Sequence, residues 1–88
     1  MSYVYEDVRP FVFTESGQVM FLEIRDRAAR LLSDAGAVRC QELLRGTVGD
    51  AWSMLACVDR LVELGELREI PQSNIAGQHR VFFRGSKR

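Results

Sequence analysis

The most informative pattern in this chain lies in residues 58–68, which read Val58-Asp59-Arg60-Leu61-Val62-Glu63-Leu64-Gly65-Glu66-Leu67-Arg68. Val58, Leu61 and Val62 have the spacing of one face of an α-helix. Gly65 readily takes the left-handed conformation that ends many helices, and the residues directly after it resemble a short strand. The stretch therefore predicts a helix that ends at Gly65 and leads directly into a strand.

Three helices are predicted in all, at residues 18–35, 40–45 and 50–64. The longest carries apolar residues at the spacings of one helical face, namely Met20, Phe21, Ile24, Ala28, Leu31 and Leu32. A glycine follows each of the first two helices and is a natural terminator. Residues 37–39, between those two helices, are too few for more than a β-bridge or a turn.

A β-hairpin is predicted after the third helix. Residues 67–70 form its first strand, which a proline stops, and residues 79–84 form its second strand after a polar loop with turn-forming residues. Alternate residues of a strand point to opposite faces. The hairpin can therefore close the apolar side of the helices with Phe82, or else with Val81 and Phe83.

The first 14 residues differ from the rest of the chain. They contain the runs Tyr3-Val4-Tyr5 and Phe11-Val12-Phe13, whose aromatic and β-branched composition favours short extended segments. Thr14-Glu15-Ser16-Gly17 then breaks the pattern and offers an N-cap for the helix that follows. The 88 residues are expected to form one domain. Its parts are an extended arm (1–14), a three-helix core (15–66), a hairpin (67–84) and a tail (85–88).

The order of these elements resembles the winged helix-turn-helix superfamily. The resemblance is most specific in residues 58–68, which look like the end of a third helix and the start of a first wing strand, and it covers residues 18–84. It implies a mainly α fold with a small β-ribbon (α+β), in which the C-terminal hairpin is the wing and the arm is an addition. DNA-binding members lay the third helix in the major groove and press the wing against the backbone or the minor groove.

The resemblance therefore implies a non-catalytic module that binds DNA or is associated with transcription. Ser53 and Arg60 belong to the outer face of the third helix, and Arg45 and Thr47 before it can hold the DNA backbone. Five basic residues stand against one acid in residues 68–88, so the wing and tail are expected to supply most phosphate contacts. The expected DNA contacts are Arg45, Thr47, Ser53, Arg60, Arg68, Arg80, Arg84, Lys87 and Arg88.

A protein-binding role stays open beside DNA binding. The formal net charge is zero, with 12 Lys and Arg against 12 Asp and Glu, whereas nucleic-acid-binding domains usually carry a basic surface. The outer face of the third helix also holds Ala56 and Glu63, with Asp59 at its margin. The alternative is an adaptor or dimerisation module that does not bind DNA directly.

The arm and Trp52 supply the candidate partner surface. The arm has too many apolar side chains to leave in water, and Leu22, Ala29 and the stem of Arg25 offer it a docking place on the first helix. The arm can lie there within its own chain or cross to a second copy and form a homodimer. Trp52 is either a partner anchor or packs under the wing or against the second helix. The expected partner or dimer surface is Tyr3, Tyr5, Phe11, Phe13, Leu22 and Trp52.

Catalysis and metal binding are not expected. His79 is the only histidine, and no Cys, Asp or Glu stands at ligand spacing from it. The sequence contains no glycine-flanked nucleophile turn, no P-loop and no HExxH motif. Cys40 and Cys57 are expected to be reduced and at least partly buried. We therefore expect no catalytic residue, no cofactor, no metal and no small-molecule substrate.

Neither a signal peptide nor a membrane span is expected. The chain turns acidic before any apolar run develops. The longest apolar run, Val19-Met20-Phe21-Leu22, is far too short to cross a bilayer. A cytoplasmic location follows as an expectation.

Overall fold

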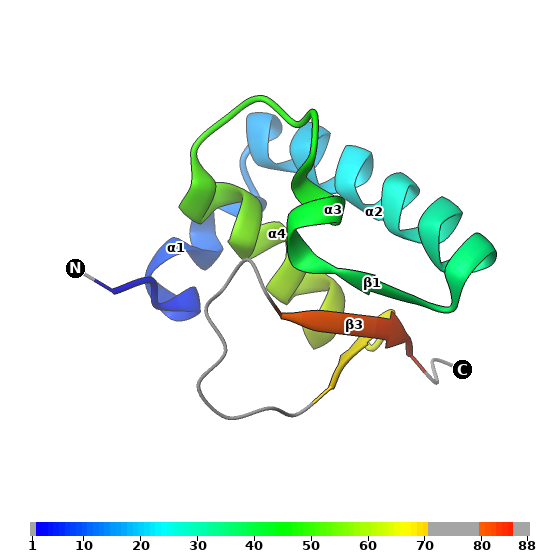
Figure 1. Cartoon of the computed structure of the whole chain (residues 1–88). Coiled ribbons are helices and arrows are strands. Elements are labelled where there is room, and N and C mark those ends of the chain that lie inside the picture. Colours follow the sequence, from blue (N-terminus) through cyan, green and yellow to red (C-terminus); the bar gives the residue numbers. More distant parts are fainter. Residues whose placement is uncertain (1, 71–79, 86–88) are drawn as a thin grey trace.

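The computed structural model describes residues 2–70 and 80–85. Within this part of the chain, four helices and three strands follow one another (Figure 1). They are α1 (Tyr5–Val12), α2 (Glu15–Ala35), β1 (Ala37–Arg39), α3 (Cys40–Leu44), α4 (Ala51–Glu63), β2 (Leu67–Glu69) and β3 (Val81–Arg84). The prediction of a mainly helical α+β fold is confirmed.

The strands form one antiparallel sheet with the order β1-β3-β2. The prediction that residues 37–39 form no more than a bridge or turn is wrong, because β1 pairs with β3 from Ala37↔Phe83 to Arg39↔Val81. The partners of β1 lie more than 40 positions away in the sequence, so the three residues of β1 show no local pattern that would predict a strand. The loop expected at residues 72–77, and the tail beyond Gly85, lie outside the described residues.

The core lies between α2, α4 and the inner face of the sheet. Phe82 is fully buried, whereas Val81 and Phe83 are only partly buried. The sequence leaves open whether Phe82, or Val81 and Phe83, face the core, and in the structure it is Phe82. The buried apolar side chains are Val12, Phe21, Ile24, Ala28, Leu32, Val38, Cys40, Leu43, Ala56, Cys57, Val58, Leu61, Leu67 and Phe82.

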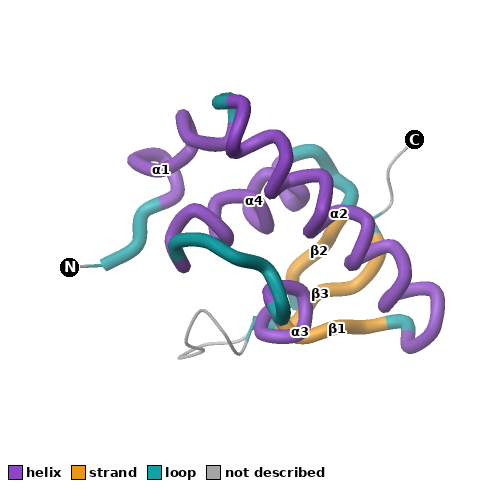
Figure 2. The backbone as a smooth tube through the Cα atoms, turned by 90° about the horizontal axis from the view of Figure 1, so that it is seen from above, coloured by secondary structure: helices purple, strands orange, loops and turns teal. Residues whose placement is uncertain are grey.

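The N-terminal arm is helical, and the prediction of extended segments is wrong. Tyr5, Val8 and Val12 have helical spacing and all pack against the core, Val12 being fully buried. This burial overrides the strand propensity of aromatic and β-branched residues. Pro10 lies inside α1 and is exposed to solvent. In Figure 2, α4 lies between α1 and the sheet.

The junction between α1 and α2 depends on Thr14 and Gly17. The Thr14 side chain accepts a hydrogen bond from the Gly17 N–H at 3.0 Å, which confirms the predicted cap and starts α2 at Glu15 rather than at residue 18. A Cβ atom at position 17 would overlap the Phe11 carbonyl oxygen. Glycine is therefore required here because the two helices approach each other too closely for any side chain.

Candidate interaction surfaces

The outer face of α4, where DNA contacts were expected, is largely covered by α1. More residues of α1 pack against α4 than against α2. Ala56, expected on the exposed face, is fully buried, and Arg60 retains 23% of its side-chain exposure. The prediction that Ala56 lies on an open surface is therefore wrong. The N-terminal helix α1 packs over this part of α4, and the sequence of α4 alone does not show that it is covered.

Polar contacts fix α1 and the residues before it to α4. The Tyr3 hydroxyl donates to Asp59 at 2.7 Å, and the Tyr5 hydroxyl donates to Glu63 at 2.7 Å. Arg9 adds an ion pair to Glu63 at 3.1 Å. Hydrogen bonds with an ionised acceptor are stronger than neutral ones, so the two acids of α4 serve as anchors for the N-terminus.

Aromatic contacts complete this attachment. The Tyr3 and Trp52 rings meet edge to face with their centroids 6.4 Å apart. Phe13 lies between two guanidinium groups, with Arg9 at 4.9 Å and Arg60 at 5.0 Å from its ring centroid. Much of the surface expected to bind a partner is therefore occupied within the same chain. Trp52 is half-buried, and its ring contact is with Tyr3 of the same chain.

The docking place proposed for the arm is wrong. Leu22 remains 49% exposed, and Ala29 and Arg25 border an open cavity instead of contacting α1. The arm packs on α4 because that helix offers both a closely packed apolar face and two carboxylates at reach of the tyrosine hydroxyls. An exchanged arm in a homodimer stays an untested prediction.

The Glu63 cluster predicts acid-sensitive attachment of α1. Hydrogen bonds from Tyr5, Arg60 and Arg9 lower the pKa of the Glu63 carboxyl from its ordinary 4.5 to about 2. A lowered pKa means that the stabilisation is complete above pH 4.5 and is lost as the pH falls towards 2. We expect the melting temperature of the unmodified chain to fall more steeply across this range than that of Glu63→Gln. Parallel curves for the two proteins would contradict the prediction.

Arg80, expected to grip phosphate from the wing, is engaged inside the molecule. It directly precedes β3, two residues before the buried Phe82, and its side chain is only 15% exposed. Its guanidinium lies 2.7 Å from Asp59 and 2.8 Å from Glu69, and 5.0 Å from the Phe82 ring centroid. Burial alone would lower the Arg80 pKa, but hydrogen bonds to Glu69 and Asp59 raise it above its ordinary value. The group is a structural cation.

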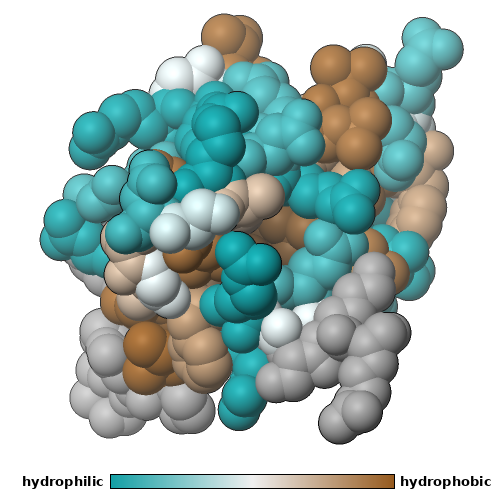
Figure 3. Space-filling view, turned by 90° about the vertical axis from the view of Figure 1, so that its right-hand side faces the viewer, coloured by the Kyte–Doolittle hydropathy of each residue, from teal (hydrophilic) through white to brown (hydrophobic). Residues whose placement is uncertain are grey.

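The arginines of β2 and β3, Arg68 and Arg84, point to opposite faces of the sheet. Arg84 pairs in register with Leu67, which is buried, so both belong to the inner side, at the end of the strand. Arg68 belongs to the outer side and stacks on Phe83 at 4.9 Å. On the face shown in Figure 3, hydrophilic groups separate smaller hydrophobic patches. Lys87 and Arg88 lie outside the described residues.

The expected contacts before and within α4 are also partly engaged. The Thr47 hydroxyl accepts a hydrogen bond from Arg27 at 2.6 Å. Ser53 donates its backbone N–H to the Asp50 carboxylate at 3.1 Å, which caps α4. Arg45 follows α3 and is exposed. Of the predicted DNA contacts in residues 2–70 and 80–85, Thr47, Ser53, Arg60 and Arg80 are therefore engaged in contacts within the molecule.

The structure also has a hollow that the sequence did not predict, which we call the Val19–Val48 hollow. It has a volume of about 390 Å³ and lies where the α1–α2 junction faces the loop before α4. Val48 is 92% exposed and Val19 is 66% exposed. Its lining residues are Phe11, Ser16, Val19, Met20, Glu23, Val48, Gly49, Asp50 and Ser53. Val48, an apolar residue within the loop before α4, is the feature of the sequence that could have indicated this hollow.

The cysteines are buried, as predicted. Cys40 opens α3 and Cys57 lies within α4, both with free thiols. Burial raises the pKa of each thiol to about 11, so both remain protonated near neutral pH. In residues 2–70 and 80–85, no cluster of three or more His, Cys, Asp or Glu side chains is arranged to hold a metal ion.

Comparisons with protein families, with curated proteins and with solved structures found no match to this chain. Among the helices of the described residues, none combines the length and the apolar character needed to cross a membrane.

Proposed function

We propose that this chain is a non-catalytic winged-helix module that binds a protein partner rather than reading DNA through α4. The observation that carries the proposal is the cover of α1 over the outer face of α4, fastened at Asp59 and Glu63. A helix so covered cannot enter a major groove, which must admit its side chains to the base edges. The succession of α2, β1, α3, α4 and a β2–β3 pair supports the winged-helix assignment.

The Val19–Val48 hollow is the surface that we assign to the partner. Soluble domains bury most large apolar side chains, and a group of exposed ones around a hollow is typical of interaction sites. Glu23 and Asp50 place two carboxylates in the lining; Glu23 also pairs with Arg27 at 3.1 Å, whereas Asp50 accepts from the backbone of Ser53 and has no ion pair among the described residues. The complementary partner is a protein segment that inserts apolar side chains and carries basic residues beside them.

Two designed helical peptides of equal length test this surface, one amphipathic with Leu and Lys and the other with Leu and Glu. We expect the Leu/Lys peptide to bind in fluorescence anisotropy and the Leu/Glu peptide to bind far more weakly. Val19→Ser combined with Val48→Ser should weaken binding about tenfold or more, because burial of each valine contributes roughly 1.5 kcal/mol or more. Val4→Ser, at another exposed valine, is the matched control. Equal binding of both peptides, or an unaffected double variant, would overturn the assignment.

DNA binding through the wing is the alternative outcome. An electrophoretic shift with mixed duplex fragments, at low and at moderate salt, decides it. We expect no complex that persists at moderate salt. A persistent complex that loses affinity and salt dependence in Arg68→Ala with Arg84→Ala would instead assign phosphate contacts to the strands. Arg80 is left unchanged in this test because its removal would disturb the fold.

A further inference from the structure

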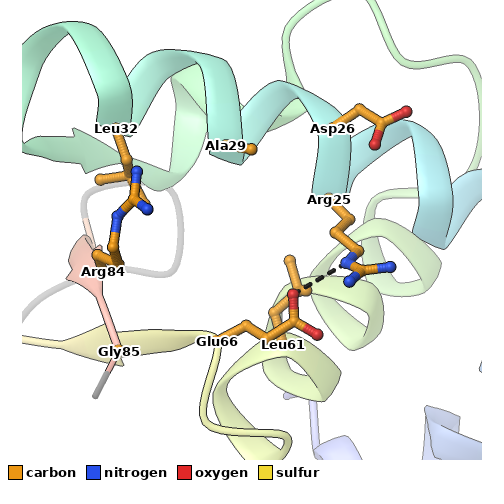
Figure 4. Close-up of a pocket in the computed structure, with 8 residues that line it drawn as sticks. All are labelled: Arg25, Asp26, Ala29, Leu32, Leu61, Glu66, Arg84 and Gly85. Atoms are coloured by element: carbon orange, nitrogen blue, oxygen red, sulfur yellow. Dashed lines mark hydrogen bonds and ion pairs between the residues drawn. The ribbon is translucent and has the colours of Figure 1, made fainter. Parts of the chain in front are cut away.

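We propose that the cavity between α2 and the end of β3 binds a small organic acid, an apolar group that carries a single carboxylate. The cavity has a volume of about 540 Å³, within the range of ligand sites. It is separate from the Val19–Val48 hollow, and the two share no lining residue. Figure 4 shows its lining, which consists of Arg25, Asp26, Ala29, Leu32, Leu61, Glu66, Arg84 and Gly85.

The cavity combines an apolar floor with cations at two ends. Leu32 and Leu61 are almost completely buried, and Ala29 adds a small side chain that leaves the space open. Arg84 and Arg25 lie on opposite sides of the gap (Figure 4). An apolar body with a charged end matches this arrangement, since burial of its carbon atoms and pairing of its anion occur together.

Arg84 is the cation available to a ligand. Among the described residues, no hydrogen bond or ion pair engages its guanidinium, whereas Arg25 donates from Nε to Glu66 at 2.9 Å. Arginine presents two parallel N–H groups that match a carboxylate. The carboxylate of the ligand is therefore assigned to Arg84, because Arg25 is already paired with Glu66.

The lining acids limit the charge of the ligand. Asp26 and Glu66 bring two carboxylates to the same cavity as the two arginines, so the formal charge of the lining is balanced. A dianion such as a phosphate monoester would meet both repulsion and an incomplete set of cations. A monocarboxylate requires only Arg84, the lining cation for which residues 2–70 and 80–85 provide no ion pair.

Two glycines hold the cavity wall in place. Gly65 ends α4 with φ +80°, and the Gly85 N–H donates to the Glu66 carbonyl at 3.0 Å. A Cβ atom at Gly85 would overlap the Gly65 carbonyl oxygen. The close contact of these two backbones, with the pairing of Arg84 to Leu67, fixes the strand end that carries the guanidinium.

Hexanoate is the probe, followed through the backbone amide signals of the full chain by NMR. Saturable shifts at Ala29 and Gly85 are expected, with a Kd of about 1 mM for so small a ligand. Hexanamide has the same shape without the charge, and hexyl phosphate carries more charge. Both should bind at least about tenfold more weakly.

Variants connect binding to the cavity. Arg84→Gln should weaken hexanoate binding about tenfold, the loss of one charged hydrogen bond, and Ala29→Leu should block the cavity. Arg68→Gln, on the opposite face of the sheet, is the matched control and should leave the Kd unchanged. Equal binding of hexanamide, or an unchanged Kd in both cavity variants, would overturn the proposal. Arg84→Gln should still bind the Leu/Lys peptide, because the Val19–Val48 hollow is unchanged in that variant. A failure of hexanoate binding can therefore be told apart from a failure of the proposed peptide site.

Discussion

Replacing Phe82 with Ala is expected to lower the free energy of unfolding by about 3–5 kcal/mol, the cost of removing a buried phenyl ring and leaving a cavity. Phe82 is fully buried on the central strand of the sheet, opposite Val38 and Glu69 in the two neighbouring strands. Its ring also lies under the Arg80 guanidinium. Domains of this size are stable by roughly 5–15 kcal/mol, so the variant loses a large share of its stability and its urea midpoint should fall markedly.

Urea denaturation followed by Trp52 fluorescence measures this effect, and Phe83→Ala is the control. Phe83 is the next residue of the same strand, partly buried on the outer face and stacked with Arg68. Its loss should cost about 1 kcal/mol, from an exposed cation–π contact and limited burial. Equal costs for the two variants would mean that the sheet doesn't close the core through Phe82.

The second large effect is expected at Arg80. Arg80→Met should lower the free energy of unfolding by about 2 kcal/mol, less than the 3–5 kcal/mol for breaking a fully buried pair, because the groups retain some contact with water. Both partners are affected, since Asp59 and Glu69 lose the cation that lies 2.7 and 2.8 Å from them. The side chains of Arg80 and Asp59 are 15% and 16% exposed.

A double-mutant cycle gives the sharpest measurement of this contact. Arg80→Met is combined with Asp59→Asn, and the coupling free energy follows from the four unfolding curves. Arg84→Gln, at the exposed end of β3, should change stability by no more than about 0.5 kcal/mol. No coupling between positions 59 and 80, or equal effects at positions 80 and 84, would contradict the structural role of Arg80.

The Arg80 result also bears on DNA binding. A loss of DNA affinity in Arg80→Ala would report a disturbed fold as readily as a lost phosphate contact. The exposed arginines at positions 68 and 84 provide the interpretable test. Arg80 and Arg84 look equivalent in the sequence, but Arg80 stabilises the fold whereas Arg84 is exposed.

Local patterns determined much of the fold. The helical spacing from Met20 to Leu32 and the stop at Gly65 place α2 and α4 within a few residues of their bounds. Thr14 caps α2 with its side chain, within the short polar stretch that predicts an N-cap. These features depend on neighbours within about four positions, so the sequence by itself carries them.

Only the tertiary structure decided what covers α4 and which charges remain available. The aromatic N-terminus has a strand-like composition, yet it is helical because Val12 finds a buried place and the hydroxyls of Tyr3 and Tyr5 reach acids 56 and 58 positions away. Arg80 is occupied, whereas Arg84 lacks a partner among the described residues, because their distances from acids on other elements differ. Propensity is local, but burial and ion pairing depend on contacts between distant segments, which no local pattern in one chain contains.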